Sequence, residues 1–190
     1  MSDATWIILL HQLLFQGLFL AKNLSLKLKL GRPIRGNNPE ANMAVLFFIA
    51  FILVSLYLAS GHWAPTSFIL LPAQAAKGLC LFLLGSNLIF GFAALRDLGE
   101  SWRVGVIEEQ RTQLVESGVY RFTRNPYFVS YLLLFGAYTI LLQNLLLLIL
   151  SLFGTGLVHA MILREETYLE RVHGSEYLQY KTRVPRYLLL

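Results

Sequence analysis

The stretch that decides the fold is YFVSYLLLFGAYTILLQNLLLLILSLFGTGLVHAMIL, residues 127–163 of the chain. It is predominantly apolar, and the pair Gln143-Asn144 interrupts it near the middle. A helix needs about 20 mainly apolar residues to cross the hydrocarbon core of a bilayer, so this stretch is too long for one crossing and just long enough for two short ones. It therefore predicts two membrane-spanning helices, 127–142 and 145–163, joined in a tight hairpin.

Three further apolar runs occupy the N-terminal half of the chain, at residues 6–21, 41–59 and 78–95. Each is long enough to cross a bilayer with modest tilt or local thinning. The 190 residues are 56% hydrophobic and 14% charged, and no Ser-rich, Pro-rich or single-sign linker divides them. We predict an all-α integral membrane protein, one domain over residues 1–190 with about five transmembrane helices, whose first span is not removed as a signal.

The basic residues gather on one side of this predicted topology. Of the 16 Lys and Arg residues, 15 fall between spans one and two, between spans three and four, or after span five, and only Lys77 falls on the other side. Lys and Arg are retained on the cytoplasmic side, which predicts a cytosolic C-terminus and an outer N-terminus. Because the basic residues flank apolar runs, the net charge of +5 favours contact with anionic membrane lipids and not with nucleic acid. The oligomeric state is not predicted.

Polar residues inside the predicted spans are expected to bond other helices and not a ligand. They are His11, Gln12, Gln16, Asn87 and His159. Their spacing matches no metal-ligand motif, so no metal site is predicted. Cys80 is the only cysteine and lies in an apolar run, which favours a packing role. Residues 61–77 contain Trp63 and Pro72, which predicts an irregular stretch at the outer membrane interface.

A charged segment precedes the first helix of the hairpin. Residues 97–125 contain five acidic residues, with five arginines within or next to the segment. Asn125 is a favoured N-cap and Pro126 a favoured first helical residue, so the helix is expected to start there. The N–H groups and partial positive charge of a helix start suit a ligand carboxylate. The alternative is plain capping, with the Arg124 side chain reaching for lipid headgroups.

A second charged segment follows the hairpin directly. Arg164, Glu165 and Glu166 emerge from the bilayer, where charges are costly unless they are paired or used. They either form an ion-pair network on the helix surface or bind a ligand, with an acid for an ammonium and Arg164 for an anion. Residues 175–190 mix aromatic, basic and aliphatic side chains, which is typical of a helix that lies at the membrane interface.

Five short motifs follow one another between residues 113 and 186. They are Leu114-Val115-Glu116-Ser117-Gly118-Val119-Tyr120, Arg124-Asn125-Pro126-Tyr127-Phe128, Glu165-Glu166-Thr167-Tyr168-Leu169, Gly174-Ser175-Glu176-Tyr177-Leu178-Gln179-Tyr180 and Arg183-Val184-Pro185. In order and spacing they resemble the motifs of the isoprenylcysteine carboxyl methyltransferase family. That family lies within a wider group that includes phospholipid N-methyltransferases and membrane-bound sterol reductases.

The match departs from the family pattern in three places. Asn125 stands where the family has His, and it can still donate a hydrogen bond. Phe128 stands where the family has Tyr, so a phenol would have to come from Tyr127. The family's substrate-side arginine falls near Met161 in this register, and Arg164, about one turn later on the same helix face, is the candidate replacement.

The resemblance implies an S-adenosylmethionine-dependent carboxyl O-methyltransferase that releases S-adenosylhomocysteine and acts on a lipid-modified, isoprenylcysteine-like substrate. It implies a cytosolic cofactor pocket within residues 110–186, formed by the loop before the fourth span and the C-terminal helix, with the substrate tail entering from the bilayer. The implied catalytic residues are Arg164 and Glu166. The implied cofactor-binding residues are Gln113, Leu114, Val115, Gly118, Tyr120, Arg124, Asn125, Pro126, Tyr127 and Glu165.

Three other functions stay open at this point. A phospholipid or small-thiol methyltransferase would share the cofactor site and differ in the pocket for the methyl acceptor. A sterol-type reductase would need a nicotinamide site instead. A noncatalytic scaffold or transporter is disfavoured, because the charged residues concentrate at one membrane face and do not line the spans.

Overall fold

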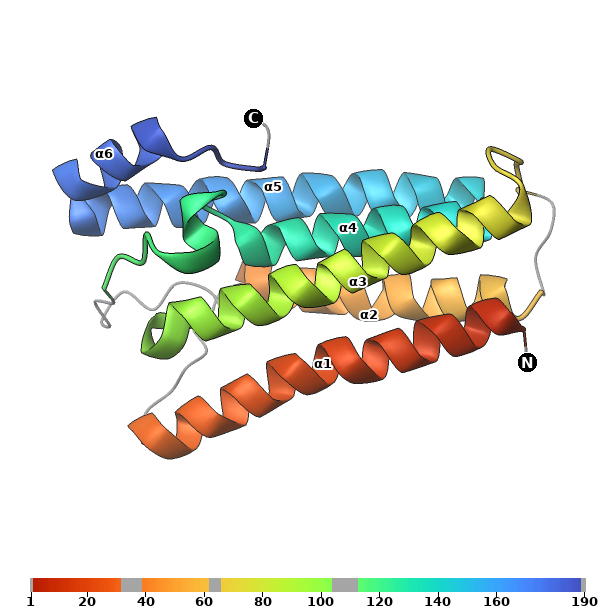
Figure 1. The fold of residues 1–190 in the computed structure, drawn as a ribbon, viewed down its shortest axis with the longest axis horizontal. Helices are drawn as coiled ribbons and strands as arrows, with labels where there is room; N and C mark the ends of the chain where they lie inside the picture. The colour runs from red at the N-terminus through yellow and green to blue at the C-terminus, as the bar shows by residue number, and fades with distance from the viewer. Residues whose placement is uncertain (1, 32–38, 62–65, 104–112, 189–190) are drawn as a thin grey trace.

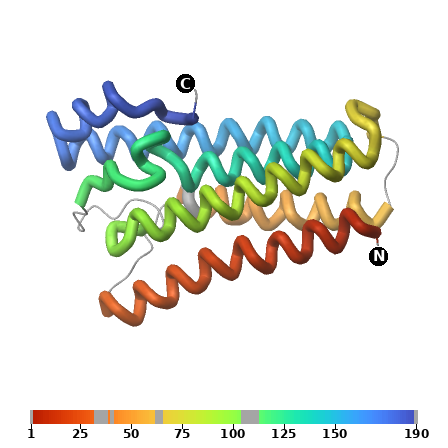
Figure 2. The backbone as a smooth tube through the Cα atoms, in the orientation of Figure 1, coloured from red at the N-terminus to blue at the C-terminus, as the bar shows by residue number. Residues whose placement is uncertain are grey.

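The structure is a computed structural model that describes residues 2–31, 39–61, 66–103 and 113–188. Within these ranges the chain forms six α-helices and two 3-10 turns (Figure 1). They are α1 (Asp3–Leu30), α2 (Pro39–Ala59), α3 (Ala73–Leu98), η1 (Gly99–Ser101), η2 (Gly118–Arg121), α4 (Pro126–Leu142), α5 (Leu145–His173) and α6 (Ser175–Arg183). The five long helices form one bundle, and α6 turns back beside the last turns of α5 (Figure 2).

The lengths and composition of the described helices are those of a multi-pass membrane protein. Four of them, α1, α2, α3 and α5, are long and apolar enough to cross a membrane. The fifth, α4, is apolar and has 17 residues. At 1.5 Å per residue it is about 26 Å long, close to the ~30 Å of a hydrocarbon core, so local thinning lets it cross. The prediction of an all-α membrane fold is confirmed.

The helices extend further than the predicted spans at one end of the bundle. The prediction ended spans one and five at the last apolar residues, but α1 continues to Leu30 and α5 to His173. Hydropathy locates the part of a helix that lies in lipid, whereas backbone caps decide where the helix ends. Gly31 ends α1 with a left-handed φ of 59°, and Gly174 ends α5 with a φ of 56°.

The hairpin between α4 and α5 turns where it was predicted to turn. Gln143 ends α4 in the left-handed conformation (φ 43°, ψ 53°), and its N–H donates to the Thr139 carbonyl at 2.8 Å. Asn144 caps α5, since its side-chain oxygen accepts a hydrogen bond from the Leu146 N–H at 3.0 Å. The Gln143 side-chain oxygen also accepts from the Leu71 N–H at 2.8 Å, which ties the turn to the segment before α3.

The helix that contains the predicted third span, 78–95, starts before residue 78. The helix α3 begins at Ala73, because Pro72 can precede a helix without the loss of a helical N–H. Lys77 therefore lies inside α3, where its ammonium donates to the Asp3 carboxylate of α1 at 2.6 Å. Of the predicted irregular stretch 61–77, residues 73–77 are helical, and 62–65 lie outside the described residues.

Buried hydrogen bonds join α1, α3 and α4 inside the bundle. The His11 ring bonds the Tyr138 hydroxyl at 2.9 Å and the Asn87 side-chain oxygen at 2.8 Å. Asn87 donates to the Ser130 carbonyl at 2.7 Å, and the Gln12 amide donates to the Tyr138 hydroxyl at 2.8 Å. Since lipid tails are as apolar as the side chains, interhelical polar bonds of this kind help to hold membrane helices together. The prediction of interhelical bonds is confirmed for His11, Gln12 and Asn87, whereas Gln16 donates to Gln12 of its own helix at 3.3 Å and lines the cavity described below.

Two other residues of the spans also have structural roles. His159 of α5 bonds the Tyr187 hydroxyl at 2.7 Å, so it holds the segment after α6 against the bundle. Cys80 is fully buried in the apolar core, which agrees with the predicted packing role.

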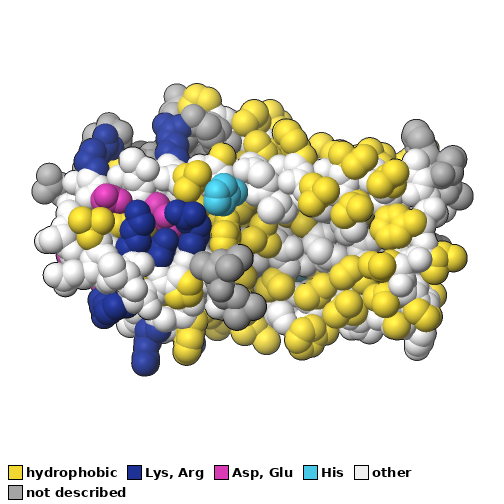
Figure 3. All heavy atoms as spheres, turned by 90° about the horizontal axis from the view of Figure 1, so that it is seen from above, with side chains coloured by type: hydrophobic (Ala, Val, Ile, Leu, Met, Phe, Trp, Pro, Cys, Tyr) yellow, Lys and Arg dark blue, Asp and Glu magenta, His cyan; other side chains and the backbone are white. Residues whose placement is uncertain are grey.

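The charged side chains gather at the end of the bundle where α1, α3 and α5 finish, which we call the charged end. On the face that Figure 3 shows, Lys, Arg, Asp and Glu lie at this end, and hydrophobic side chains cover most of the remainder. An ion pair between Lys29 and Glu100, at 2.5 Å, joins the end of α1 to η1. The opposite end, with the turn between α4 and α5, is the hairpin end.

We predict that Asn87→Ala lowers the free energy of unfolding by about 1–2 kcal/mol, because it removes two buried interhelical bonds, one to Nε2 of His11 and one to the Ser130 carbonyl. The measurement is reversible unfolding in mixed detergent micelles. The neighbouring Ser86→Ala is the control, since Ser86 is partly exposed and its hydroxyl donates to the Phe82 carbonyl of its own helix. Equal stability of the two variants would show that the buried bonds do not hold the bundle together.

Candidate functional site

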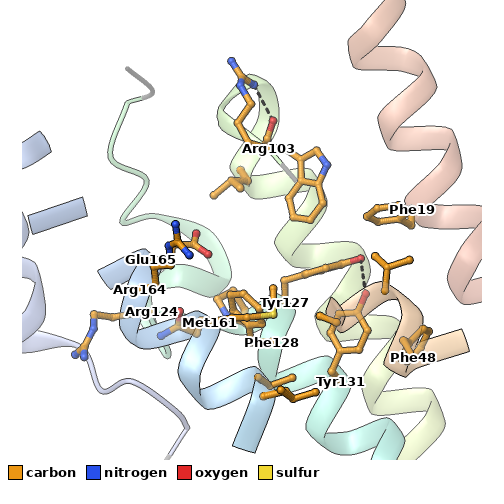
Figure 4. A pocket seen from close by; sticks show the side chains of 18 of the residues that line it. Phe19, Phe48, Arg103, Arg124, Tyr127, Phe128, Tyr131, Met161, Arg164 and Glu165 are labelled. Atoms are coloured by element: carbon orange, nitrogen blue, oxygen red, sulfur yellow. Dashed lines mark hydrogen bonds between the residues drawn. The ribbon is translucent and has the colours of Figure 1, made fainter. Parts of the chain in front are cut away.

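A cavity of about 510 Å³ lies within the bundle and reaches the charged end. This volume is in the range of small-molecule sites in proteins. Its wall includes side chains from α1, α2, α4 and α5, from the segment after α3, and from residues 113–115. Figure 4 shows Arg164 and Glu165 on one side of the cavity and Phe19, Phe48 and Tyr131 on the other. The cavity therefore has a polar part and an apolar part.

The structure brings most of the predicted site residues to this one cavity. All the predicted cofactor-binding residues except Gly118 line it, and so does Arg164. The two contributing segments, residues 113–127 and 164–165, are far apart in the sequence and meet because the α4–α5 hairpin returns the chain to the end it left. The α6 helix closes this part, with Tyr177 and Tyr180 packed against Leu114.

Gly118 lies outside the cavity wall and has a structural role. Its φ is 62°, and a Cβ atom there would lie 2.0 Å from a carboxylate oxygen of Asp97. The same carboxylate accepts a hydrogen bond from the Val119 N–H at 2.8 Å. Only glycine allows this close approach, which fixes η2 to the end of α3. Gly118 thus helps to position Tyr120, which lines the cavity, although Gly118 itself does not line it.

Glu166 also lies outside the cavity wall, in a buried ion-pair cluster. Its carboxylate accepts from Arg124 at 2.9 Å, from Arg186 at 2.8 Å and from the Asn125 amide at 3.2 Å. The exposed fraction of the Glu166 side chain is 5% and that of Arg124 is 7%. Burial opposes ionisation of Glu166, but hydrogen bonds from the two arginines outweigh it and hold the pKa of this carboxyl below its ordinary value.

Arg124 joins this cluster to the segment after α6. Its guanidinium donates to the carbonyls of Val184 and Lys181, at 2.5 and 3.2 Å, and its N–H donates to the Pro185 carbonyl at 3.0 Å. The side chain lines the cavity with its stem, while the charged group points away from the centre (Figure 4). Arg124 therefore does not reach for lipid headgroups, which was the alternative considered for it.

The start of α4 differs in one respect from a simple cap. Asn125 is at the N-cap position and Pro126 is the first helical residue, as predicted. The Asn125 side chain makes no capping bond, because its amide donates to Glu166 and to the Arg186 carbonyl. Asn125, Pro126 and Tyr127 all line the cavity, so the positive end of the α4 dipole faces it.

Of the two neighbouring acidic residues Glu165 and Glu166, Glu165 is the one that lines the cavity. It belongs to the part of α5 that continues beyond the apolar residues 145–163. Burial in the cavity wall, together with the neighbouring Glu166 carboxylate, raises the pKa of Glu165 to about 7. A carboxyl group with this pKa ionises fully when a cation binds next to it. Consecutive helical residues point about 100° apart, which explains why Glu165 and Glu166 have different surroundings.

The apolar part of the cavity contains aromatic side chains that sequence reasoning missed. Trp102 lies 4.7 Å from Tyr127 and 6.0 Å from Phe19 between ring centroids, and Tyr131 lies 5.4 Å from Tyr127. The Trp102 indole donates to the Asn23 side chain of α1 at 2.9 Å. These residues come from α1, α4 and the segment after α3, so no single stretch of sequence revealed them. We call Phe19, Trp102, Tyr127 and Tyr131 the aromatic wall.

The cavity of this helical membrane protein is charged at one end and apolar along the rest. Such a cavity is suited to bind a polar ligand next to a lipid-like one. The family model described as phospholipid methyltransferase matches residues 73–176, more than half of the chain. The chain belongs to this phospholipid methyltransferase family, which includes the isoprenylcysteine carboxyl methyltransferases, and is therefore a membrane methyltransferase. No curated protein matches the chain.

We predict that Glu166→Gln lowers the free energy of unfolding by about 3 kcal/mol, because it leaves two arginines near a neutral side chain in a buried place. Chemical unfolding in detergent measures this loss. The control is Glu170→Gln, which removes a half-exposed pair with Lys181 and should cost less than about 1 kcal/mol. A loss for Glu166→Gln as small as that of the control would refute the role of the cluster.

Proposed function

We propose that the chain transfers a methyl group from S-adenosylmethionine to the carboxylate of a lipid-modified, isoprenylcysteine-like acceptor. The observation that carries the proposal is the cavity itself, in which Glu165, Arg164 and the start of α4 lie at the charged end of an otherwise apolar space. With the C-terminus in the cytosol, as the basic residues predict, the cofactor would arrive from the cytosol and the acceptor tail from the bilayer.

The charged end fits the polar groups of the proposed cofactor. Glu165 suits its ammonium, and the uncapped start of α4 at Asn125 suits its carboxylate. Leu114 and Val115 line the same part of the cavity and suit the flat adenine. Tyr120 or Tyr127 would face the sulfonium. When bound, S-adenosylmethionine supplies an activated methyl group.

The chain's own task would then be to align the acceptor and to exclude water. An acceptor carboxylate is already ionised at neutral pH, so it needs no general base. Arg164 lines the cavity next to Glu165 and would hold this carboxylate in line with the methyl group. Glu166, predicted as a catalytic residue, would act as a positioning residue, since its ion pairs fix Arg124 and the start of α4.

A second acceptor class has an observation in its favour. The four rings of the aromatic wall line the cavity, and aromatic rings bind ammonium groups by cation–π contacts. An amine-bearing phospholipid is therefore the alternative acceptor, and it would share the cofactor site. A small thiol would leave the apolar part unfilled. A sterol-type reductase would require the cavity to bind a nicotinamide cofactor.

We predict that S-adenosylhomocysteine raises the melting temperature of the detergent-solubilised protein, whereas NADPH does not, because a ligand of the folded state stabilises it by mass action. Glu165→Gln should weaken this binding about tenfold to a hundredfold, since a hydrogen bond to a charged group contributes about 1.5–3 kcal/mol. Calorimetry measures the affinity. Stabilisation by NADPH alone would contradict the methyltransferase function.

We predict that the affinity for S-adenosylhomocysteine increases with pH. The ammonium of the ligand favours ionised Glu165, and the raised pKa of about 7 means that the empty site is half protonated near neutral pH. Affinity should therefore rise between pH 6 and pH 8, and binding should release a proton near pH 7. In Glu165→Gln this rise should disappear, while Glu170→Gln should keep it.

We predict that Arg164→Ala leaves the affinity for S-adenosylhomocysteine nearly unchanged but lowers methyl transfer to a farnesylated cysteine analogue about a hundredfold, through lost alignment of the acceptor. Radiolabelled methyl transfer measures the activity. Full activity of Arg164→Ala with this carboxylate would refute the assigned role. Transfer to an ethanolamine phospholipid, with none to the cysteine analogue, would instead establish the amine acceptor.

A further inference from the structure

Beside α4 and α5, the residues that line the apolar part of the cavity end near the middle of the bundle. The α5 residues that line the cavity run from Leu169 at the charged end to Gly154, the last of them toward the hairpin end. On α4 the corresponding last residue is Phe135, whereas on α2 the residues that line the cavity continue past Phe47 to Ile52. From Glu165 to Gly154 is 11 residues, or about 16 Å along a helix with a rise of 1.5 Å per residue. A hydrocarbon tail bound beside α5 therefore has a limited length available.

Two phenylalanine rings lie over Gly154 at this end of the cavity wall. The rings of Phe47 and Phe135 pack edge to face, with centroids 6.1 Å apart, and both side chains line the cavity. Phe135 is 3% exposed and packs against the fully buried Phe51, with centroids 4.9 Å apart. Tyr138 is fully buried just beyond it in the same core cluster. Beside α4 and α5, the space beyond the rings is therefore filled by the core.

Gly154 allows the rings to take these places. A Cβ atom at this position would lie 2.6 Å from Cε1 of Phe47 and 2.9 Å from Cε2 of Phe135. These distances are too short for van der Waals contact, so any larger residue would displace a ring. Phe135 is held by the buried core, whereas Phe47 is only partly buried and lines the cavity. An alanine at position 154 would thus push Phe47 into the space that a tail occupies.

We propose that Gly154, Phe47 and Phe135 form the floor of the acceptor-tail site and set the longest hydrocarbon tail that the enzyme accepts. This inference rests on the methyltransferase function proposed above. The occupant is the apolar tail of the methyl acceptor, because the α2 and α5 side chains that line the cavity away from its charged end are apolar, namely Ala44, Val45, Phe48, Ile49, Ile52, Leu157, Val158 and Met161. A polar ligand would lose hydrogen bonds there.

The chain offers a matched control for this floor. Gly156 lies two residues further along α5, and a Cβ atom there would meet nothing within 4 Å. Gly156→Ala therefore changes the same helix in the same way without a contact to the cavity floor. Phe47→Leu has the opposite effect from Gly154→Ala. It removes a ring and so deepens the site, whereas Gly154→Ala makes it shallower. The partly buried position of Phe47 makes the folded state tolerant of the change.

The experiment measures kcat/KM for radiolabelled methyl transfer to acceptors of graded tail length. The probes are S-prenylcysteine analogues with two, three or four isoprene units and, in a second arm, ethanolamine phospholipids with short to long acyl chains. Gly154→Ala should lower the ratio of long-tail to short-tail kcat/KM at least about tenfold, as expected for a misfit of about one methylene group. Phe47→Leu should raise this ratio, and Gly156→Ala should leave it unchanged.

Failure of this inference is distinct from failure of the proposed function. If the enzyme methylates either class of acceptor but all three variants keep the wild-type length profile, the floor is refuted and the methyltransferase function stands. If neither acceptor is methylated and S-adenosylhomocysteine does not bind, the proposed function is refuted. The floor is then tested by thermal stabilisation with prenyl alcohols, whose length preference must still shift in opposite directions in Gly154→Ala and Phe47→Leu for the floor to stand.

Discussion

The ion-pair cluster of Glu166 with Arg124 and Arg186 is the interaction on which the site depends. It joins three parts of the chain, since Glu166 lies on α5, Arg124 precedes α4 and Arg186 follows α6. A buried ion pair adds little net stability compared with an apolar core of the same volume, because desolvation of the charges offsets their attraction. What the cluster provides is geometry, since it leaves these segments one arrangement in which all the charges have partners.

The direction of each side chain follows from this arrangement. Once Glu166 is turned toward the arginines, its neighbour Glu165 must point about 100° away, into the cavity. The Asn125 amide is drawn to Glu166 and therefore does not cap α4. The cavity thus receives an acidic side chain and an uncapped helix start together, and both result from one structural cluster outside its wall.

The apolar part of the cavity depends on how the helices pack in the membrane. In lipid the helices gain little from the hydrophobic effect, so polar bonds such as those of His11 hold them together. Close packing at Gly154 limits the cavity beside α5, and aromatic side chains from α1, α4 and the segment after α3 form one side of its wall. A ligand from water and a ligand from lipid can meet in such a space without either crossing the whole bilayer.

The sequence by itself determined the spans, the hairpin turn and most of the polar cavity residues. Long apolar runs identify the segments that lie in lipid, and Gln143-Asn144 interrupts one such run. The motifs at 113–127 and 164–166 are contiguous stretches with distinctive spacing. Only the tertiary structure decided that Glu165 faces the cavity while Glu166 and Gly118 support it from outside, and that Phe19, Phe47 and Trp102 complete the wall. The physical reason is that side-chain direction and contacts between distant helices depend on packing in three dimensions, which no local pattern encodes.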